Sequence, residues 1–202
     1  MEILLASGNS HKKQELEKIL PGHTLLTPAD LGIPFNHEET GETFSDNARG
    51  KALALHKLTG KPVLADDSGI CVPALGGAPG IYSARYGSRP GGPDLEAPER
   101  NALLLKNMEG KEDRRAFFVC AMVLLFDEYR HYTIQETVEG RLTHAPAGAG
   151  GFGYDPLFYL EEYGKTMAEL PAEEKNLISH RGKAGAGMAL LLDRNSAVPA
   201  HA

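Results

Sequence analysis

A run of apolar residues at positions 116–126 is the strongest strand signal in the chain, and it constrains the fold more than any other segment. Residues 132–138 alternate well enough to pair with it after a turn at residues 127–130. Shorter apolar runs at residues 3–6 and 62–65 suit strands that are buried on both faces. None of these runs is long enough to span a bilayer. The sequence therefore predicts a sheet with buried central strands.

Helical spacing of apolar residues separates these strands. It predicts helices at residues 11–20, 43–58, 97–108, 172–178 and 183–192. Residues 73–94 hold many prolines and glycines and read as a long loop, and residues 157–159 read as a further strand. Strands alternate with helices early, whereas two strands are adjacent in the middle, which favours an α/β fold with a mixed central sheet flanked by helices. We expect one domain over residues 1–194 and a disordered tail over residues 195–202.

Composition excludes several classes of protein. The chain has 202 residues, 42% of them hydrophobic, so it can bury a core and is neither disordered nor a disulfide-dependent miniprotein. Its formal charge of −6 does not suit a protein that wraps duplex DNA or lies on an anionic membrane. Cys71 and Cys120 are too far apart for a CxxC pair and are expected to be buried, reduced thiols. The opening residues lack the apolar core of a signal peptide, so we expect a cytoplasmic protein that binds neither nucleic acid nor membrane.

The first strand leads through Ser7, Gly8 and Asn9 into a helix that carries Lys12 and Lys13. Backbone N–H groups at a helix start, with lysines within reach, suit an oligophosphate. The segment is not a Walker A loop, because G-x-x-x-x-G-K-[ST] is absent. An ordinary N-capped helix with two solvated lysines would have the same sequence.

Two adjacent carboxylates, Asp66 and Asp67, follow the apolar strand at residues 62–65, where open α/β sheets place their ligands. Successive strand residues point to opposite faces, so we expect the two aspartates to have different roles. Glu39 precedes a helix that carries Lys51, and with Asp67 it would supply a carboxylate pair for Mg²⁺ if the fold brings them together. The alternative interpretations are a solvated turn for Asp66 and Asp67 and a helix-capping role for Glu39.

Two late segments offer groups for an organic ligand. Residues 148–153 match G-x-G-x-x-G, but no helix follows, so we reject a dinucleotide fingerprint. A loop that lets the backbone approach a ligand, with Phe152 available to stack on a flat ring, fits better. Lys175, His180 and Arg181 form a set of donors for carbonyl oxygens or phosphate, although a charged helix surface would give the same residues.

Six segments taken together are more specific than any one of them. They occur in one order and are Ser7-Gly8-Asn9-x-x-Lys12, Glu38-Glu39-Thr40-Gly41-x-Thr43-Phe44, Ala65-Asp66-Asp67-Ser68-Gly69, Gly76-Gly77-Ala78-Pro79-Gly80-Ile81-Tyr82-Ser83-Ala84-Arg85-Tyr86, Gly151-Phe152-Gly153-Tyr154-Asp155-Pro156 and Ser179-His180-Arg181-Gly182. This order resembles the inosine/xanthosine triphosphate pyrophosphatase family over nearly the whole chain. Ser7 stands where that family often has Thr, which keeps the hydroxyl.

The resemblance implies an elongated α/β fold with two lobes around a substrate cleft, usually dimeric. It implies Mg²⁺-dependent hydrolysis of ITP, dITP or XTP to the monophosphate and pyrophosphate. By similarity, Asp67 is the catalytic proton acceptor, and Asp67 and Glu39 bind the metal. Lys12 and Lys51 are expected to be catalytic through their positive charge. The residues that would bind substrate by similarity are Ser7, Gly8, Asn9, Ser10, His11, Lys12, Ser68, Phe152, Gly153, Tyr154, Asp155, Lys175, His180 and Arg181.

The chemistry of the expected reaction agrees with these roles. Cations would neutralise the charge that grows on a pyrophosphate leaving group, and a carboxylate can position water for in-line attack. A pocket of donors would accept the C6 oxygen of hypoxanthine or xanthine and disfavour the amino group of adenine. A pyrophosphatase for other modified nucleotides and a non-catalytic nucleotide sensor are the alternative functions.

Overall fold

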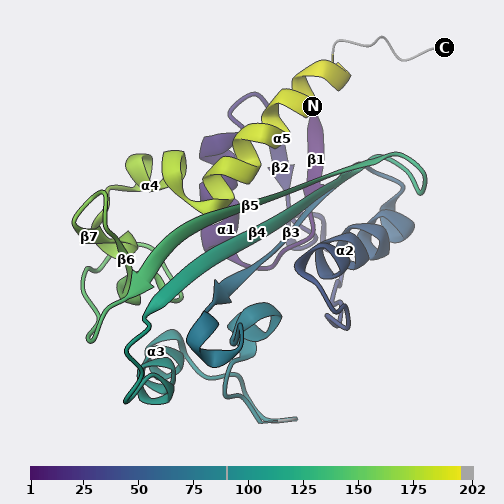
Figure 1. Cartoon of the computed structure of the whole chain (residues 1–202). Coiled ribbons are helices and arrows are strands. Elements are labelled where there is room, and N and C mark those ends of the chain that lie inside the picture. The colour runs from purple at the N-terminus through teal and green to yellow at the C-terminus, as the bar shows by residue number, and fades with distance from the viewer. Residues whose placement is uncertain (90, 197–202) are drawn as a thin grey trace, which may run out of the picture. The chain divides into compact units, whose positions relative to one another are not determined.

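The computed structural model describes residues 1–89 and 91–196. Its seven strands form one mixed sheet in the order β2-β1-β3-β4-β5-β6-β7 (Figure 1). The strands are β1 (Glu2–Leu5), β2 (Thr24–Leu26), β3 (Val63–Cys71), β4 (Arg115–Leu125), β5 (His131–Leu142), β6 (Phe158–Leu160) and β7 (Lys165–Thr166). β1 pairs in parallel with β2 and β3, whereas β6 is antiparallel to β5 and β7. The mixed α/β class predicted from the sequence is confirmed.

The helices occur where apolar periodicity predicts them. They are α1 (Ser10–Ile19), α2 (Phe44–Thr59), α3 (Ala97–Asn107), α4 (Ala172–Ile178) and α5 (His180–Ser196). The α2 helix starts at a Thr43 cap and ends at Gly60, whose φ of 65° an L side chain rarely adopts. None of the helices in the described part of the chain is long and apolar enough to cross a lipid bilayer.

The chain divides into two compact units. Unit 1 comprises Met1–Asp67, Cys120–Glu136 and, as far as the structure describes it, residues 180–196; unit 2 comprises Ser68–Val119 and Thr137–Ser179. The boundaries fall inside β3, β4 and β5 and between α4 and α5. Each unit has its own buried core.

Unit 1 buries an apolar cluster on each face of its strands. On one face α1 packs against α5, and Leu16 and Met188 are fully buried beside Leu64 of β3. On the other face Ala52 and Leu55 of α2 lie in a second cluster. Burial on both faces explains why the first strands read as continuous apolar runs.

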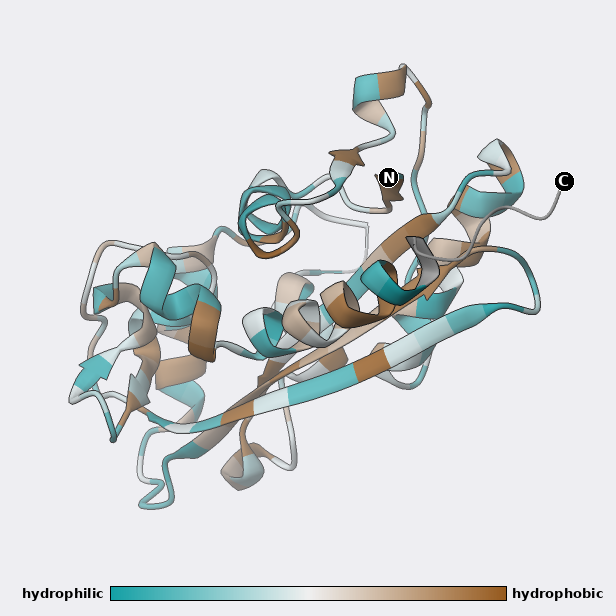
Figure 2. Ribbon diagram, turned by 90° about the horizontal axis from the view of Figure 1, so that it is seen from above, coloured by the Kyte–Doolittle hydropathy of each residue, from teal (hydrophilic) through white to brown (hydrophobic). Residues whose placement is uncertain are grey.

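Unit 2 has one core. Its centre includes Phe118 and Phe158, whose ring centroids lie 4.5 Å apart. Figure 2 shows the contrast between the two long strands: β4 is hydrophobic over most of its length, whereas β5 alternates between hydrophilic and hydrophobic residues. The alternation means that only one face of β5 is buried.

Several predicted boundaries were wrong. β3 does not end at Ala65 but continues to Cys71, so both aspartates lie inside the strand. The loop at residues 73–94 contains two 3₁₀ helices, Pro73–Leu75 and Gly80–Arg85. β2 and β7 were not predicted, because strands of three and two residues carry little periodicity. α5 includes residues 195 and 196, and the rest of the predicted tail, residues 197–202, lies outside the described residues.

Candidate active site

A polar loop connects β1 to α1 in unit 1. Asn9 is the N-cap of α1, and its side chain accepts hydrogen bonds from the backbone N–H groups of His11 (2.9 Å) and Lys12 (3.2 Å). The N–H of Asn9 in turn donates to Oγ of Ser7 at 3.1 Å. The loop is thus shaped by its own side chains, as the sequence predicted for a helix start.

This loop lines a cavity of about 290 Å³ within unit 1. Residues 7–10 form one part of its wall, and Lys13, residues 27–30 and Phe35 contribute to the rest. A Cβ atom built on Gly8 would meet nothing within 4 Å, so the glycine borders open space. Lys13 lies 2.7 Å from Asp30, which holds the lysine within the wall of the cavity. The loop therefore has room for a ligand beside its backbone.

Asp66 is the centre of a buried ion-pair cluster on the face of β3 that carries α1 and α5. Its Oδ2 lies 3.0 Å from Nζ of Lys12 and accepts hydrogen bonds from Nε (3.2 Å) and a terminal nitrogen (3.0 Å) of Arg181. The other terminal nitrogen of Arg181 donates to Glu15 at 2.8 Å. Burial alone would raise the pKa of Asp66, but Lys12 and Arg181 outweigh it and hold that pKa well below its usual range. Asp66 is therefore a permanent anion that holds Lys12 and Arg181 in place.

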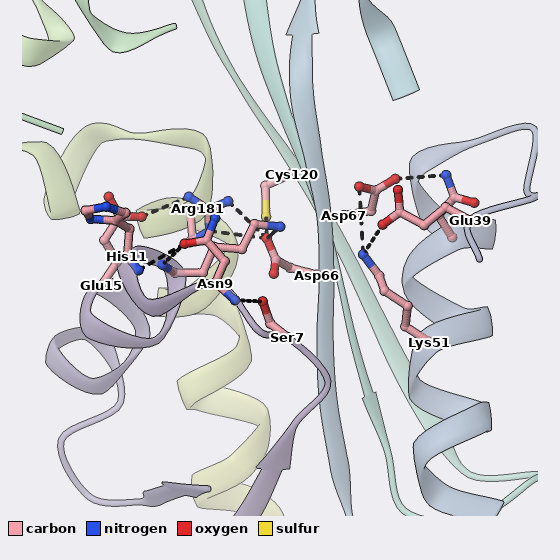
Figure 3. Close-up of polar contacts among 12 residues, drawn as sticks. Ser7, Asn9, His11, Glu15, Glu39, Lys51, Asp66, Asp67, Cys120 and Arg181 are labelled. Carbon is pink, nitrogen blue, oxygen red and sulfur yellow. Dashed lines mark hydrogen bonds and ion pairs between the residues drawn. The ribbon is translucent and has the colours of Figure 1, made fainter. Parts of the chain in front are cut away.

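Asp67 points to the opposite side of β3, toward α2 (Figure 3). Its Oδ2 accepts a hydrogen bond from Asn47 at 3.0 Å, and Nζ of Lys51 lies 3.9 Å from its Oδ1. Lys51 also donates to Glu39 at 2.6 Å. Burial raises the pKa of Asp67, with the charge of Glu39 adding to that effect and the nearby Lys51 opposing it. A buried carboxylate with a raised pKa is suited to accept a proton.

Glu39 and Asp67 share one cation, because both carboxylates approach Nζ of Lys51. Burial lowers the pKa of Lys51, but the charges of Asp66, Asp67 and Glu39 outweigh it, so the pKa is raised and the lysine stays protonated. No group of three or more metal-binding side chains occurs among the described residues. A pair of converging carboxylates nonetheless fits Mg²⁺, which uses one or two protein carboxylates together with water and substrate phosphates.

The cysteines are free and buried, as predicted. Burial, together with the charge of Asp66, raises the pKa of the Cys120 thiol to about 12. Burial also raises the pKa of Cys71. Both residues therefore remain thiols at neutral pH and are poor nucleophiles.

The aromatic–glycine loop, residues 148–155, lies in unit 2. Its sequence match to a dinucleotide fingerprint is rightly rejected, because a short 3₁₀ helix and β6 follow it. Oδ2 of Asp155 accepts hydrogen bonds from the backbone N–H of Phe152 and from Nζ of Lys175, each at 2.7 Å. The same Nζ lies 4.8 Å from the centroid of the Phe152 ring. Asp155 and Lys175 are almost fully buried, so this arrangement is part of the packed structure of unit 2.

The predicted site residues separate into two sets. Unit 1 contains Ser7, Gly8, Asn9, Ser10, His11, Lys12, Glu39, Lys51, Asp67, His180 and Arg181. Unit 2 contains Ser68, Phe152, Gly153, Tyr154, Asp155 and Lys175. Within unit 1, Lys12 and Arg181 both contact Asp66, and Lys51 contacts Glu39 and Asp67. Within unit 2, Lys175 contacts Phe152 and Asp155. His180 and Arg181 begin α5 and are buried.

Sequence reasoning missed two side chains in unit 1, Asn47 and Glu15. Asn47 lies one helical turn before Lys51 on α2, and Glu15 lies one turn after Lys12 on α1. A search for polar residues at i±3 and i±4 from each predicted cation would have found both.

The chain is similar to known proteins over most of its length. Residues 3–190 match the family model described as Ham1 family. The chain is 55% identical to a dITP/XTP pyrophosphatase of Treponema denticola, over 91% of this chain and 94% of that protein. It is 50% identical to a dITP/XTP pyrophosphatase of Thermus thermophilus, over 91% and 88% of the two chains.

Solved structures give the same result. The structure of the Staphylococcus aureus Ham1 protein matches 96% of this chain and all of that chain, with a TM-score of 0.86 and 38% identity. A HAM1 protein from Coxiella burnetii gives a TM-score of 0.87 at 38% identity, over 96% and 99% of the two chains. The resemblance found in the sequence is confirmed, and the chain belongs to the Ham1 family.

Proposed function

We propose that this protein hydrolyses deaminated purine nucleoside triphosphates, ITP, dITP and XTP, to the monophosphate and pyrophosphate. The observation that carries the proposal is the buried Asp67, whose Oδ1 lies 3.9 Å from the same ammonium group that Glu39 contacts at 2.6 Å. The names of the relatives, dITP/XTP pyrophosphatases, support the substrate class.

Mg²⁺ is the cofactor that we propose, with Glu39 and Asp67 as its protein ligands. The bound ion would neutralise charge on the triphosphate. Lys12 and Lys51 add positive charge for the same purpose. The loop at residues 7–10 would bind the phosphates through its backbone N–H groups, for which the cavity in unit 1 leaves space.

The chemical step that we propose is direct attack by water. A water oxygen forms a bond to the α-phosphorus while the bond from that phosphorus to the α–β bridging oxygen breaks. The water proton passes to the Asp67 carboxylate, and pyrophosphate leaves with the bridging oxygen. Burial raises the pKa of Asp67 in the metal-free protein and bound Mg²⁺ would lower it, so the proposed role rests on the position of this carboxylate beside Glu39 and Lys51.

Base recognition is assigned to Phe152, Lys175 and His180. Phe152 would stack on the purine, and Lys175 would donate to the C6 oxygen. Adenine presents an amino donor at C6 and would leave the donor in the pocket unpaired, which is costly. Arg181, whose guanidinium is already occupied by Asp66 and Glu15, would contribute mainly by holding its neighbours.

The decisive experiment is a pyrophosphate-release assay over ATP, GTP, ITP, XTP and dITP, with Mg²⁺ and with a chelator. We expect kcat/KM for ITP, dITP and XTP to exceed that for ATP at least ~100-fold, and no turnover with the chelator. In ¹⁸O-labelled water the label should enter only the monophosphate. Equal hydrolysis of ATP, or turnover confined to modified pyrimidines, would contradict the substrate class. Binding without turnover would indicate a nucleotide sensor.

We also propose that the protein acts as a cytoplasmic homodimer and binds no nucleic acid. The proposal follows from the family resemblance and from the net charge of −6, which does not favour polyanions. Light scattering during size-exclusion chromatography measures the mass of the particle, and a mass of 21.8 kDa would contradict a dimer.

A further inference from the structure

Two segments of unit 2 have no role in the function proposed above. They are residues 76–86, the longest of the shared sequence segments, and α3. Each contacts the aromatic–glycine loop through a hydrogen bond, which is buried for residues 76–86 and partly buried for α3.

Ser83, within residues 76–86, contacts the loop through its backbone. Oη of Tyr154 donates to the carbonyl oxygen of Ser83 at 2.8 Å. The hydroxyl of Ser83 accepts from the N–H of Ile70 (2.9 Å) and donates to the carbonyl of Gly80 (2.7 Å). Tyr154 and Ser83 are each 5% exposed. Residues 76–86 therefore connect the loop to the end of β3 inside unit 2.

Asn101 of α3 contacts the loop through its side chain. Nδ2 donates to the carbonyl oxygen of Gly153 at 3.1 Å, and the residue is 5% exposed. Its Oδ1 is buried and has no hydrogen-bond partner within the described ranges. A buried asparagine with an unsatisfied oxygen is costlier than a leucine of similar shape, so packing alone does not account for it. The donation to Gly153 is what this side chain contributes.

Two of these hydrogen bonds hold the backbone before and after the side chain of Phe152. Asp155 holds the N–H of Phe152, and Asn101 holds the carbonyl of Gly153, the next residue. We propose that Asn101 is a positioning residue for base recognition, which pre-sets the ring of Phe152 for stacking on the purine. This inference rests on the proposed function of Phe152. A ring that is already oriented loses less conformational freedom when the base binds.

The kinetic test compares Asn101→Leu with Asn107→Leu. Asn107 lies on the same helix and donates to the hydroxyl of Tyr86 at 2.7 Å, but it is exposed and does not contact the loop. We expect Asn101→Leu to raise KM for ITP ~10-fold with kcat changed less than ~2-fold, because base binding is weakened while the catalytic groups of unit 1 are unchanged. Asn107→Leu should leave both constants unchanged.

A spectroscopic test separates positioning from a general loss of stability. The chain contains no tryptophan, so Phe152→Trp places a single tryptophan at the position in question, and it is excited at wavelengths that the seven tyrosines do not absorb. Adding Asn101→Leu to this variant should increase acrylamide quenching of the tryptophan and lower its anisotropy in the absence of nucleotide. Adding Asn107→Leu should change neither. Thermal unfolding of each variant shows whether it is folded at the assay temperature.

The outcomes are distinct. Unchanged KM together with unchanged quenching in folded Asn101→Leu overturns the inference. If the leucine variant does not fold, Asn101→Ser, which also lacks the amide donor, takes its place with the same expectations. If the wild-type protein does not hydrolyse ITP, the proposed function fails, but the quenching measurement still tests whether Asn101 orders the loop.

Discussion

Asp66 and Asp67 are adjacent and chemically identical, yet the structure gives them opposite properties. The pKa of Asp66 is lowered because Lys12 and Arg181 outweigh its burial. The pKa of Asp67 is raised because burial outweighs the attraction of Lys51. Opposite pKa shifts of two carboxyl groups in one site are typical of groups with different roles. At the scale of the residue, Asp66 is a structural anion and Asp67 is the candidate base.

The first prediction concerns Asp66. Asp66→Asn leaves the partly buried Lys12 and the buried Arg181 without their shared carboxylate, and should lower the free energy of unfolding by about 3–5 kcal/mol in urea at neutral pH. Because the folded-state pKa is lowered, this stabilisation is present above the ordinary carboxyl pKa of 3.8 and is lost as pH falls toward the folded value. The difference between wild type and variant should therefore shrink below pH 4. A difference that is absent at neutral pH would contradict the structural role.

The second prediction concerns the pH dependence set by Asp67. The reaction needs the carboxylate, so kcat/KM should fall as pH drops through the pKa of Asp67, which burial raises in the metal-free protein and bound Mg²⁺ would lower. The hydrogen bond from Asn47 lowers that pKa, so Asn47→Leu should move the acid limb of the profile to higher pH. The control is Asn107→Leu, which should leave the limb in place. A limb that moves to lower pH in Asn47→Leu would refute the assignment of Asp67 as the base.

At the scale of the element, the β1–α1 loop has open space where a ligand is proposed. The third prediction uses Gly8, where an added Cβ meets nothing within 4 Å of protein. Gly8→Ala should leave the melting temperature unchanged or slightly raised and should increase KM for ITP about tenfold, because the methyl group occupies space beside the proposed phosphates.

Gly22→Ala is the matched control, since a Cβ there also meets nothing within 4 Å and the residue does not line the cavity. Both alanine variants should unfold at similar temperatures, and only Gly8→Ala should bind substrate more weakly. Equal KM values in the two variants would place the phosphates elsewhere.

Most elements could be predicted from the sequence because their apolar periodicity is strong. The helices α2 and α4 are good examples, and Thr43 marks the start of α2. β3 was cut short because Asp66, Asp67, Ser68 and Gly69 are typical turn residues. Inside the strand the charges of the two aspartates are compensated by cations from α1, α2 and α5. Such partners are distant in sequence, so local propensity cannot reveal them.

The candidate site shows the same limit. The family resemblance predicted roles for Asp67 and Glu39, and the charge of the leaving group predicted one for Lys51. In the structure the ammonium group of Lys51 contacts both carboxylates. The period of two along a strand predicts that the two aspartates point to opposite faces, and in the structure they do (Figure 3). Asn47, Glu15 and Asn101 were missed because the sequence around a polar helix residue does not show whether its side chain is buried.

At the scale of the whole molecule, neither composition nor periodicity marks where one unit ends and the other begins. Unit 1 is assembled from three segments of the chain and unit 2 from two. Domain boundaries are usually marked by polar or flexible linkers, but here they fall inside β3, β4 and β5. Val119 and Cys120, on the two sides of one boundary, are both buried strand residues. A division of this kind follows from tertiary contacts and leaves no trace in composition.

The alternation of β3 has a consequence for how this chain can vary. Because side chains alternate with a period of two, shifting β3 by a single residue against its neighbours would turn each of its two carboxylates to the opposite face. Asp67 would then lie on the face of α1 and α5, and Asp66 would lie on the face of α2. An insertion or deletion of one residue within Val63–Ala65 should thus abolish turnover even where hydrophobic residues still fill the core. An insertion or deletion of two residues leaves each aspartate on its original face of the strand.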